Sequence, residues 1–185
     1  MSPVDPRAAV HDPAGPAETA ACPGCGAVLA VVPGLPLRHP GASAGCAALF
    51  AVTVRGLRDE SAQDPRAAGL LQLATAAYDA QHLVPGEPAA APVRLRLVLE
   101  HGRLPVPGEV TDAPAGITPP AHWTTTIADL AADLDVVDLP TLVRSWATAV
   151  RADWSPSLDR LRTVAGGTPP PGETATTANG GGHLD

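Results

Sequence analysis

Residues 64–82 have the sequence DPRAAGLLQLATAAYDAQH and predict the central helix of a mainly helical domain. Asp64 is a preferred helix-capping residue, and Pro65 suits the first helical position, where its missing N–H costs nothing. Apolar or small side chains then recur on one face, which comprises Leu70, Leu73, Ala74, Ala77, Tyr78 and Gln81. We therefore expect a helix that ends near His82 and buries this face in the core.

Two more helices are predicted on either side of this one. Residues 44–58 follow a capping residue, Ser43, and carry apolar side chains at helical spacing: Cys46, Phe50, Val54 and Leu57. Residues 93–99 alternate at first as a strand would, but 100–102 resemble a helix end, so we favour a helix. Residues 27–41 are too interrupted by proline for a helix and predict a short strand or extended run followed by a loop.

The C-terminal half predicts two further helices after a proline-rich loop over 103–123. The fourth helix is capped within 124–126 and has an apolar stripe formed by Ile127, Leu130, Ala131 and Leu134. The fifth and longest begins near Pro140 behind a cap at Asp138, with Trp146 and Trp154 on its buried face. Pro156 is expected to kink or restart it. The sequence thus predicts a compact bundle of about five helices.

Length and composition predict one domain between two tails. A chain of 185 residues with 45% hydrophobic residues supports one core of ordinary size. Residues 1–20 and 166–185 contain too little apolar material to offset the entropy of ordering. We expect disordered tails there and a helical domain over 21–165.

The charge pattern excludes some partners. The net charge is −7, all 12 basic residues are Arg, and they do not cluster, so nucleic acid is not expected as a partner. No apolar stretch approaches the roughly 20 residues that span a bilayer. Three cysteines and an acidic, proline-rich start without a signal sequence favour a reduced, cytoplasmic setting.

The clearest chemical signal is CPGCG at 22–26, which we call the knuckle. Its two cysteines supply half of the tetrahedral shell that zinc requires. Two antiparallel helices joined by a short loop would bring Cys46, near the start of one, close to His82, at the end of the other. We therefore predict a structural zinc ion bound by Cys22, Cys25, Cys46 and His82. An empty knuckle and a thiol redox pair remain alternatives, and Cys46 alone also suits a small buried apolar position.

Few other residues suggest chemistry. Tyr78 and His82 are four residues apart on one helix face and are candidates for a proton donor and acceptor pair, or for a core pair with polar tips. Acidic residues at 129, 133, 135 and 138 fit a solvated helix face better than a carboxylate metal site. Four other histidines have no convincing partner by spacing; these are His39, His101, His122 and His183.

Several motifs, in this order, resemble an uncharacterised family of small actinobacterial proteins. They are CPGCG at 22–26, GASAGCAALF at 41–50, QLATAAYDAQH at 72–82, RLVLEHG at 96–102 and the segment with Trp146 and Trp154. Family members show CPGCG, GASPGCW-like and DAYAVQHPG-like stretches and then a Trp-rich C-terminal helix. The resemblance covers about 22–162 and implies one helical domain with no known activity. The chain departs from the family with Ala47 in place of Trp, Ala76 in place of Asp, and Ser157-Leu158 where a His pair is common.

Three classes of function remain open from the sequence. The first is a metal-stabilised helical protein that acts as a binding or accessory module for a protein or small-molecule partner. The second is an enzyme that uses a metal or the Tyr78/His82 pair on a small molecule. The third is a thiol redox protein. The residues missing relative to the family count against the second class.

Overall fold

A computed structural model describes residues 18–31, 33–34, 39–83, 90–103 and 118–165, with side chains described up to 158. Residues 1–17 of the tail predicted at 1–20, the whole tail predicted at 166–185, and most of the loop predicted at 103–123 lie outside these residues. The elements in chain order are β1 (Thr19–Ala21), β2 (Val28–Ala30), α1 (Ala44–Thr53), α2 (Arg55–Glu60), α3 (Pro65–Gln81), α4 (Ala90–His101), α5 (Ile127–Ala132) and α6 (Leu139–Ala165). The prediction of a mainly helical fold is confirmed.

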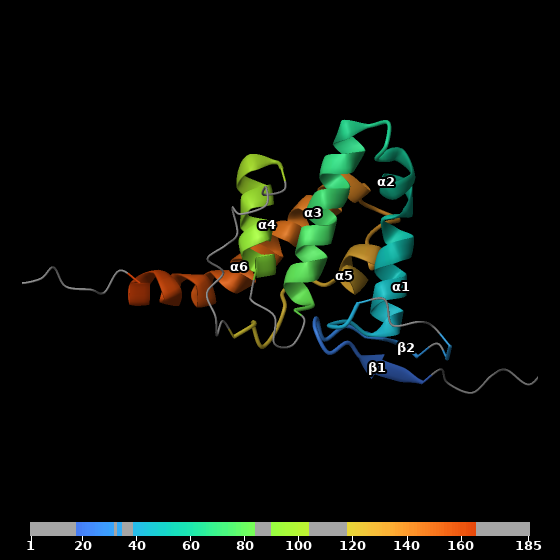
Figure 1. Cartoon of the computed structure of the whole chain (residues 1–185). Helices are drawn as coiled ribbons and strands as arrows, with labels where there is room; N and C mark the ends of the chain where they lie inside the picture. The colour runs from blue at the N-terminus through green and yellow to red at the C-terminus, as the bar shows by residue number, and fades with distance from the viewer. Residues whose placement is uncertain (1–17, 32, 35–38, 84–89, 104–117, 166–185) are drawn as a thin grey trace, which may run out of the picture.

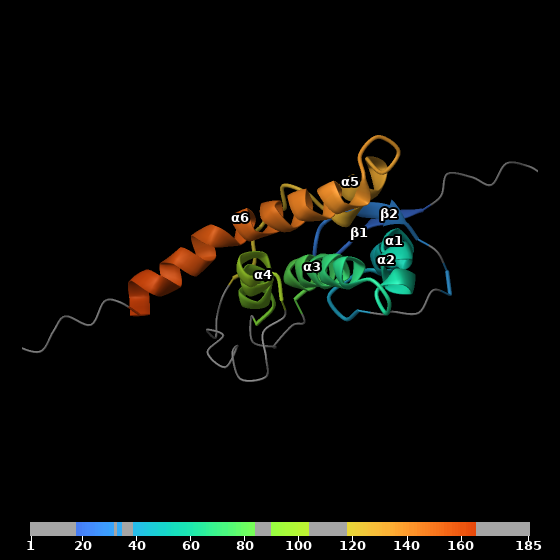
Figure 2. The same cartoon turned by 90° about the horizontal axis from the view of Figure 1, so that it is seen from above.

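Helix α3 lies at the centre of the bundle. It packs against α2, α4 and α6, while α1 packs against α5 (Figure 1). Viewed from above, the long α6 runs along one side of α4 and α3 (Figure 2). The small β1–β2 hairpin lies at the end of the bundle where α1 begins and α3 ends (Figure 1). This arrangement brings three separate chain segments to one end of the bundle.

The predicted helix at 44–58 forms with a break. Val54 leaves helical geometry at φ −95° and ψ 10°, which separates α1 from α2. Backbone hydrogen bonds still run from Val54 N to Phe50 O and from Arg58 N to Val54 O. Leu57 therefore stays on the same buried side as Phe50. The described residues thus form six helices, one more than the sequence suggested.

The predicted starts of α3, α5 and α6 coincide with side-chain caps. Asp64 Oδ1 accepts from Arg66 N at 2.8 Å, and Thr126 forms a capping box with Asp129. Asp138 accepts from Thr141 N at 3.0 Å. At 93–99 the helix prediction is confirmed, and α4 ends before Gly102, whose φ of 66° suits a glycine after a helix.

One expectation for the C-terminal half is wrong, and one of the two outcomes expected at Pro156 is excluded. Leu134 does not extend the buried stripe of α5, because the helix ends at Ala132 and the chain turns, leaving Leu134 37% exposed. Helix α6 does not restart at Pro156 but continues to Ala165. Proline removes one backbone hydrogen bond, but Trp154 and Leu158 on either side pack against the core and hold the helix together.

A strand begins inside the segment predicted as a tail. Thr19–Ala21 pairs antiparallel with Val28–Ala30, in the register Thr19 to Ala30 and Ala21 to Val28. Its Ala-rich sequence has little strand propensity, and the pairing is imposed by the turn that the knuckle forms between the strands. This strand thus begins before the predicted domain boundary at 21. The predicted short strand after the knuckle is β2.

The core is built around α6 and α3. Trp146 and Trp154 have no exposed surface, as predicted, and the expected buried face of α3 is buried throughout. Within the described ranges, no helix is both long and apolar enough to span a lipid bilayer.

Candidate metal centre

The knuckle is the tip of the β1–β2 hairpin. Cys22 N donates to Ala27 O, and Gly26 N donates to Cys22 O, each at 2.9 Å. Gly26 has a φ of +76°, a conformation that favours glycine. The resulting tight turn directs Cys22 and Cys25 inward, where both are almost completely buried.

Cys46 reaches the knuckle from the first turn of α1. Ser43 caps this helix, because its Oγ accepts from Cys46 N at 3.2 Å. The Ser43 backbone N–H donates to Cys22 Sγ at 3.3 Å. A predicted capping residue therefore also supports a sulfur of the knuckle. Backbone N–H groups of this kind favour the thiolate form of a cysteine.

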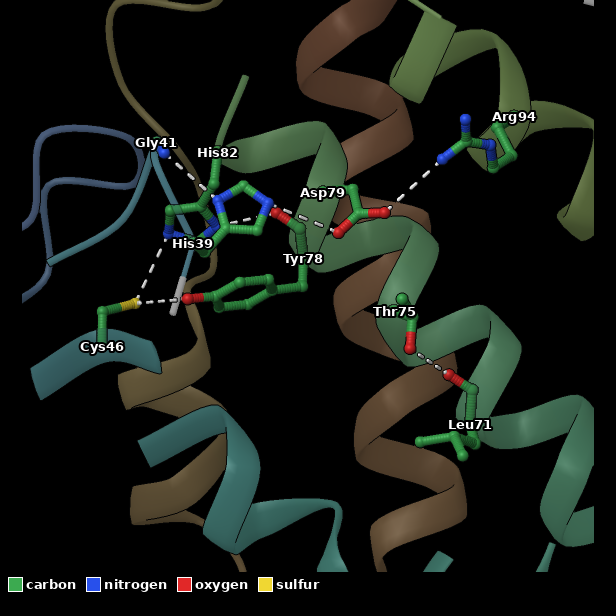
Figure 3. Close-up of polar contacts among 9 residues, drawn as sticks. All are labelled: His39, Gly41, Cys46, Leu71, Thr75, Tyr78, Asp79, His82 and Arg94. Carbon is green, nitrogen blue, oxygen red and sulfur yellow. Dashed lines mark hydrogen bonds and ion pairs between the residues drawn. The ribbon is translucent and has the colours of Figure 1, made fainter. Parts of the chain in front are cut away.

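His82 ends α3 with its imidazole fully buried. His82 Nδ1 lies 2.7 Å from Tyr78 O. Since a carbonyl oxygen only accepts, Nδ1 carries a proton, which leaves Nε2 as the nitrogen that could bind a metal once it is deprotonated. Nε2 lies 3.4 Å from Cys46 Sγ (Figure 3). This is the tautomer and support typical of a metal-binding histidine.

The structure brings all four predicted ligands together. The ligand atoms of Cys22, Cys25, Cys46 and His82 lie within 4.8 Å of one another, and all four residues are buried. The Cys25 and Cys46 sulfurs are 3.8 Å apart. Tetrahedral zinc with Zn–S bonds of about 2.3 Å would place two sulfurs about 3.8 Å apart, and a sulfur and a nitrogen about 3.6 Å apart. The observed separations of 3.8 Å and 3.4 Å fit a single zinc ion.

The pKa shifts of the cluster residues indicate that their donor atoms share protons. Hydrogen bonds from Cys25 and Cys46 hold the pKa of the Cys22 thiol well below its usual range. Hydrogen bonds with Cys22 and Cys25, together with burial, hold the pKa of Cys46 well above it. Burial lowers the pKa of His82, but its hydrogen bonds with Cys22 and Cys25 outweigh burial and raise the pKa to about 9. A cation among these donors would replace the shared protons.

Tyr78 supports the cluster and is not paired with His82 through its hydroxyl. The two rings do meet, with centroids 4.0 Å apart. The Tyr78 hydroxyl, however, donates to Cys46 Sγ at 3.8 Å (Figure 3). Burial, followed by the proximity of Cys46, raises its pKa well above the usual range. The Tyr78 hydroxyl and His82 Nε2 are thus both directed at Cys46 Sγ, and His82 Nδ1 is directed at a backbone carbonyl oxygen.

A second polar group flanks the cluster and was missed from the sequence. His39 Nδ1 accepts from Gly41 N at 3.2 Å, and His39 Nε2 lies 3.7 Å from Asp79 Oδ1. Asp79 Oδ2 in turn lies 3.5 Å from Arg94 (Figure 3). His39 also contacts the edges of the Tyr78 and His82 rings. The expectation that His39 has no partner is therefore wrong: besides Gly41, it meets Tyr78, Asp79 and His82, which lie 39 to 43 residues away in the chain.

Two glycines allow the knuckle to approach the end of α3. A Cβ atom on Gly24 would lie 2.6 Å from Gly41 O and 2.7 Å from Gln81 O. A Cβ on Gly41 would collide with the backbone of His82, whose carbonyl carbon would be 2.7 Å away. Trp123 closes the other side, with its Nε1 donating to Gly24 O at 2.9 Å. Backbone packing therefore fixes the position of the knuckle.

A cleft of about 680 Å³ lies on the outer side of the knuckle. Its wall includes Trp123, His122 and Thr126, and the knuckle forms part of its floor.

The alternative carboxylate site finds no support, because its four acidic residues are exposed, and Asp129 and Asp138 serve as helix caps. Among the described residues, only the Cys22, Cys25, Cys46 and His82 cluster groups three or more potential ligands.

The comparisons with known proteins give one match. A family described as "Family of unknown function (DUF5946)" matches residues 20–155. This range contains all four cluster residues and most of the region whose motifs resemble an uncharacterised family. No curated protein and no solved structure matches the chain.

Proposed function

Since the chain belongs to the DUF5946 family of unknown function, we propose its role from the site itself: Cys22, Cys25, Cys46 and His82 bind one structural zinc ion. The observation that carries this proposal is the convergence of four buried donor atoms within 4.8 Å from three separate chain segments. Three thiols and one imidazole are a typical donor set of structural zinc.

The ion would stabilise the fold by linking three chain segments that meet at one end of the bundle. The β1–β2 hairpin exposes five of its six strand residues. A shared metal would connect this hairpin to the start of α1 and the end of α3. Zinc contributes directly to folding free energy in such sites, because the unfolded chain has no preformed site.

The site favours a structural ion over a catalytic one. Catalytic zinc keeps a coordination position open for water or substrate, whereas four protein ligands close the shell. Tyr78 and His82 are buried and already hydrogen-bonded, so neither offers a free proton acceptor to the cleft. We therefore propose a zinc-stabilised binding or accessory module. We place it in the cytoplasm, where buried free cysteines remain reduced, with a protein or small molecule and not nucleic acid as its partner.

Stability with and without metal tests the structural role. Zinc-loaded protein and protein stripped by a chelator are compared by thermal unfolding, and zinc is then added back. The proposal expects the stripped protein to lose thermal stability and the added zinc to restore it. The Cys46→Ser variant should resemble the stripped protein and gain nothing from zinc, while an exposed control, His122→Ala, should behave as the wild type. Equal stability with and without zinc would refute the structural role.

A further inference from the structure

A second cleft lies at the opposite end of α3 from the metal centre. It has a volume of about 590 Å³ and is formed by the first half of α3, the end of α4 and the first half of α6. These three helices lie together in both views (Figures 1 and 2). The 17 residues of α3, at 1.5 Å each, separate its start from His82 by about 25 Å. The cleft is therefore independent of the proposed zinc site.

Two arginines give this cleft a positive charge. Arg66 and Arg144 line it from α3 and α6, and its lining contains no carboxylate. Within the described ranges, neither guanidinium forms an ion pair or a hydrogen bond. This local charge contrasts with the net charge of −7 of the chain.

The floor of the cleft is apolar. Leu70 and Leu73 from α3 meet Val98 and Leu99 from α4 there. Leu70, Leu73 and Val98 belong to the hydrophobic core, and Leu99 packs against it. A cleft of a few hundred Å³ with an apolar floor and a few converging polar groups is the usual form of a small-molecule site.

Gly69 keeps this space open. It lies inside α3 and lines the cleft, yet a Cβ atom added to it would have no atom within 4 Å. Glycine in a helix interior is destabilising relative to alanine, and no close packing in the fold requires it at this position. Glycine at this position therefore leaves this part of the cleft free of a side chain.

We infer that this cleft binds a small organic anion with an apolar body. A carboxylate or phosphate head pairs with Arg66 and Arg144, since guanidinium groups match both in geometry. The hydrocarbon part covers Leu70, Leu73 and their neighbours on α4. This ligand class goes beyond the zinc site and does not depend on it.

Calorimetric titration of the zinc-loaded full chain with decanoate and with decyl phosphate tests the inference, each below its micelle concentration. Decanol serves as the uncharged probe. At least one anion should bind with one site per chain and about tenfold or more tighter than decanol, and the tighter of the two identifies the head group. Arg66→Gln and Arg144→Gln should each weaken that binding about tenfold or more, because each removes a charge-assisted hydrogen bond. Arg58→Gln, an exposed arginine of α2 outside the cleft, is the matched control and should bind as the wild type.

A Gly69→Met variant provides a steric test. Its side chain enters the open space, so the fold is retained and anion binding is lost. Circular dichroism and thermal unfolding verify that each variant is folded. Absence of saturable binding by both anions would overturn the inference. Decanol binding as tight as that of the anions would also overturn it. Anion binding that is unchanged after Gly69→Met, or after both arginines are replaced, would do the same.

Discussion

The buried contact between Trp146 and Gln81 provides a sharp test of how α6 stabilises the end of α3. Trp146 Nε1 donates to Gln81 Oε1 at 3.1 Å, and Gln81 Nε2 donates to Thr125 O at 2.8 Å. Gln81 directly precedes the proposed ligand His82. The polar chain thus connects α6, α3 and the segment before α5 next to the metal centre.

A Trp146→Phe variant removes the donor and part of the ring. It leaves Gln81 Oε1 buried without this partner, which costs about 1 to 3 kcal/mol. The smaller ring adds a cavity of about three heavy atoms; scaled from the full truncation of a buried aromatic side chain, this costs about 1 kcal/mol. We therefore expect the free energy of unfolding to fall by about 3 kcal/mol. Trp146→Ala should cost about 3 to 5 kcal/mol, the range for truncating a large buried aromatic residue.

A double-mutant cycle separates the two contributions. In a Gln81→Met background the buried acceptor is absent, so Trp146→Phe should cost only the cavity contribution of about 1 kcal/mol. Urea unfolding of the zinc-loaded proteins, followed by circular dichroism, measures all four species. Equal costs of Trp146→Phe in the two backgrounds would show that the hydrogen bond contributes nothing and would refute the reasoning.

Three other predictions concern the backbone near the site, a helix cap and protons. Gly41→Ala should destabilise the protein by about 1 to 3 kcal/mol in thermal or urea unfolding, because its Cβ meets the His82 backbone. Gly56→Ala, with nothing near its Cβ, should be neutral or stabilising by up to about 1 kcal/mol, and equal effects of the two would contradict the packing described. Thr126→Ala should cost about 1 kcal/mol by removing the α5 capping box, and an unchanged urea midpoint would count against it. Zinc affinity, measured by chelator competition, should rise with pH up to about 9, because His82 with its pKa of about 9 must lose a proton to bind; an affinity that is flat from pH 6 to 9 would exclude this.

Local signals in the sequence were sufficient to predict most helices. Asp64-Pro65 and the apolar face up to Gln81 predicted α3 to within a residue, because capping and periodicity are properties of neighbouring residues. The four cluster residues could be chosen because zinc needs four ligands and few cysteines and histidines were available. The break at Val54 and the continuous helix through Pro156 could not be predicted from local signals, since tertiary packing decides them.

The surroundings of the site depend on long-range contacts that carry no sequence pattern. Trp123 and Gly24 are 99 residues apart, and His39 meets Asp79 from an irregular segment. The need for glycine at position 41 arises only once the knuckle is packed against the end of α3. The sequence contains these residues, but it does not indicate which of them come into contact in the fold.

The zinc content of the protein tests the central claim most directly. The full chain is expressed without a His-tag, purified without chelators and analysed by elemental mass spectrometry alongside Cys25→Ser, His82→Ala and the exposed control His122→Ala. The account predicts one zinc per chain in the wild type and the control, and a clear loss in the other two variants. Wild-type protein free of metal under these conditions, or a Cys25→Ser variant that retains both full zinc content and full stability, would contradict it.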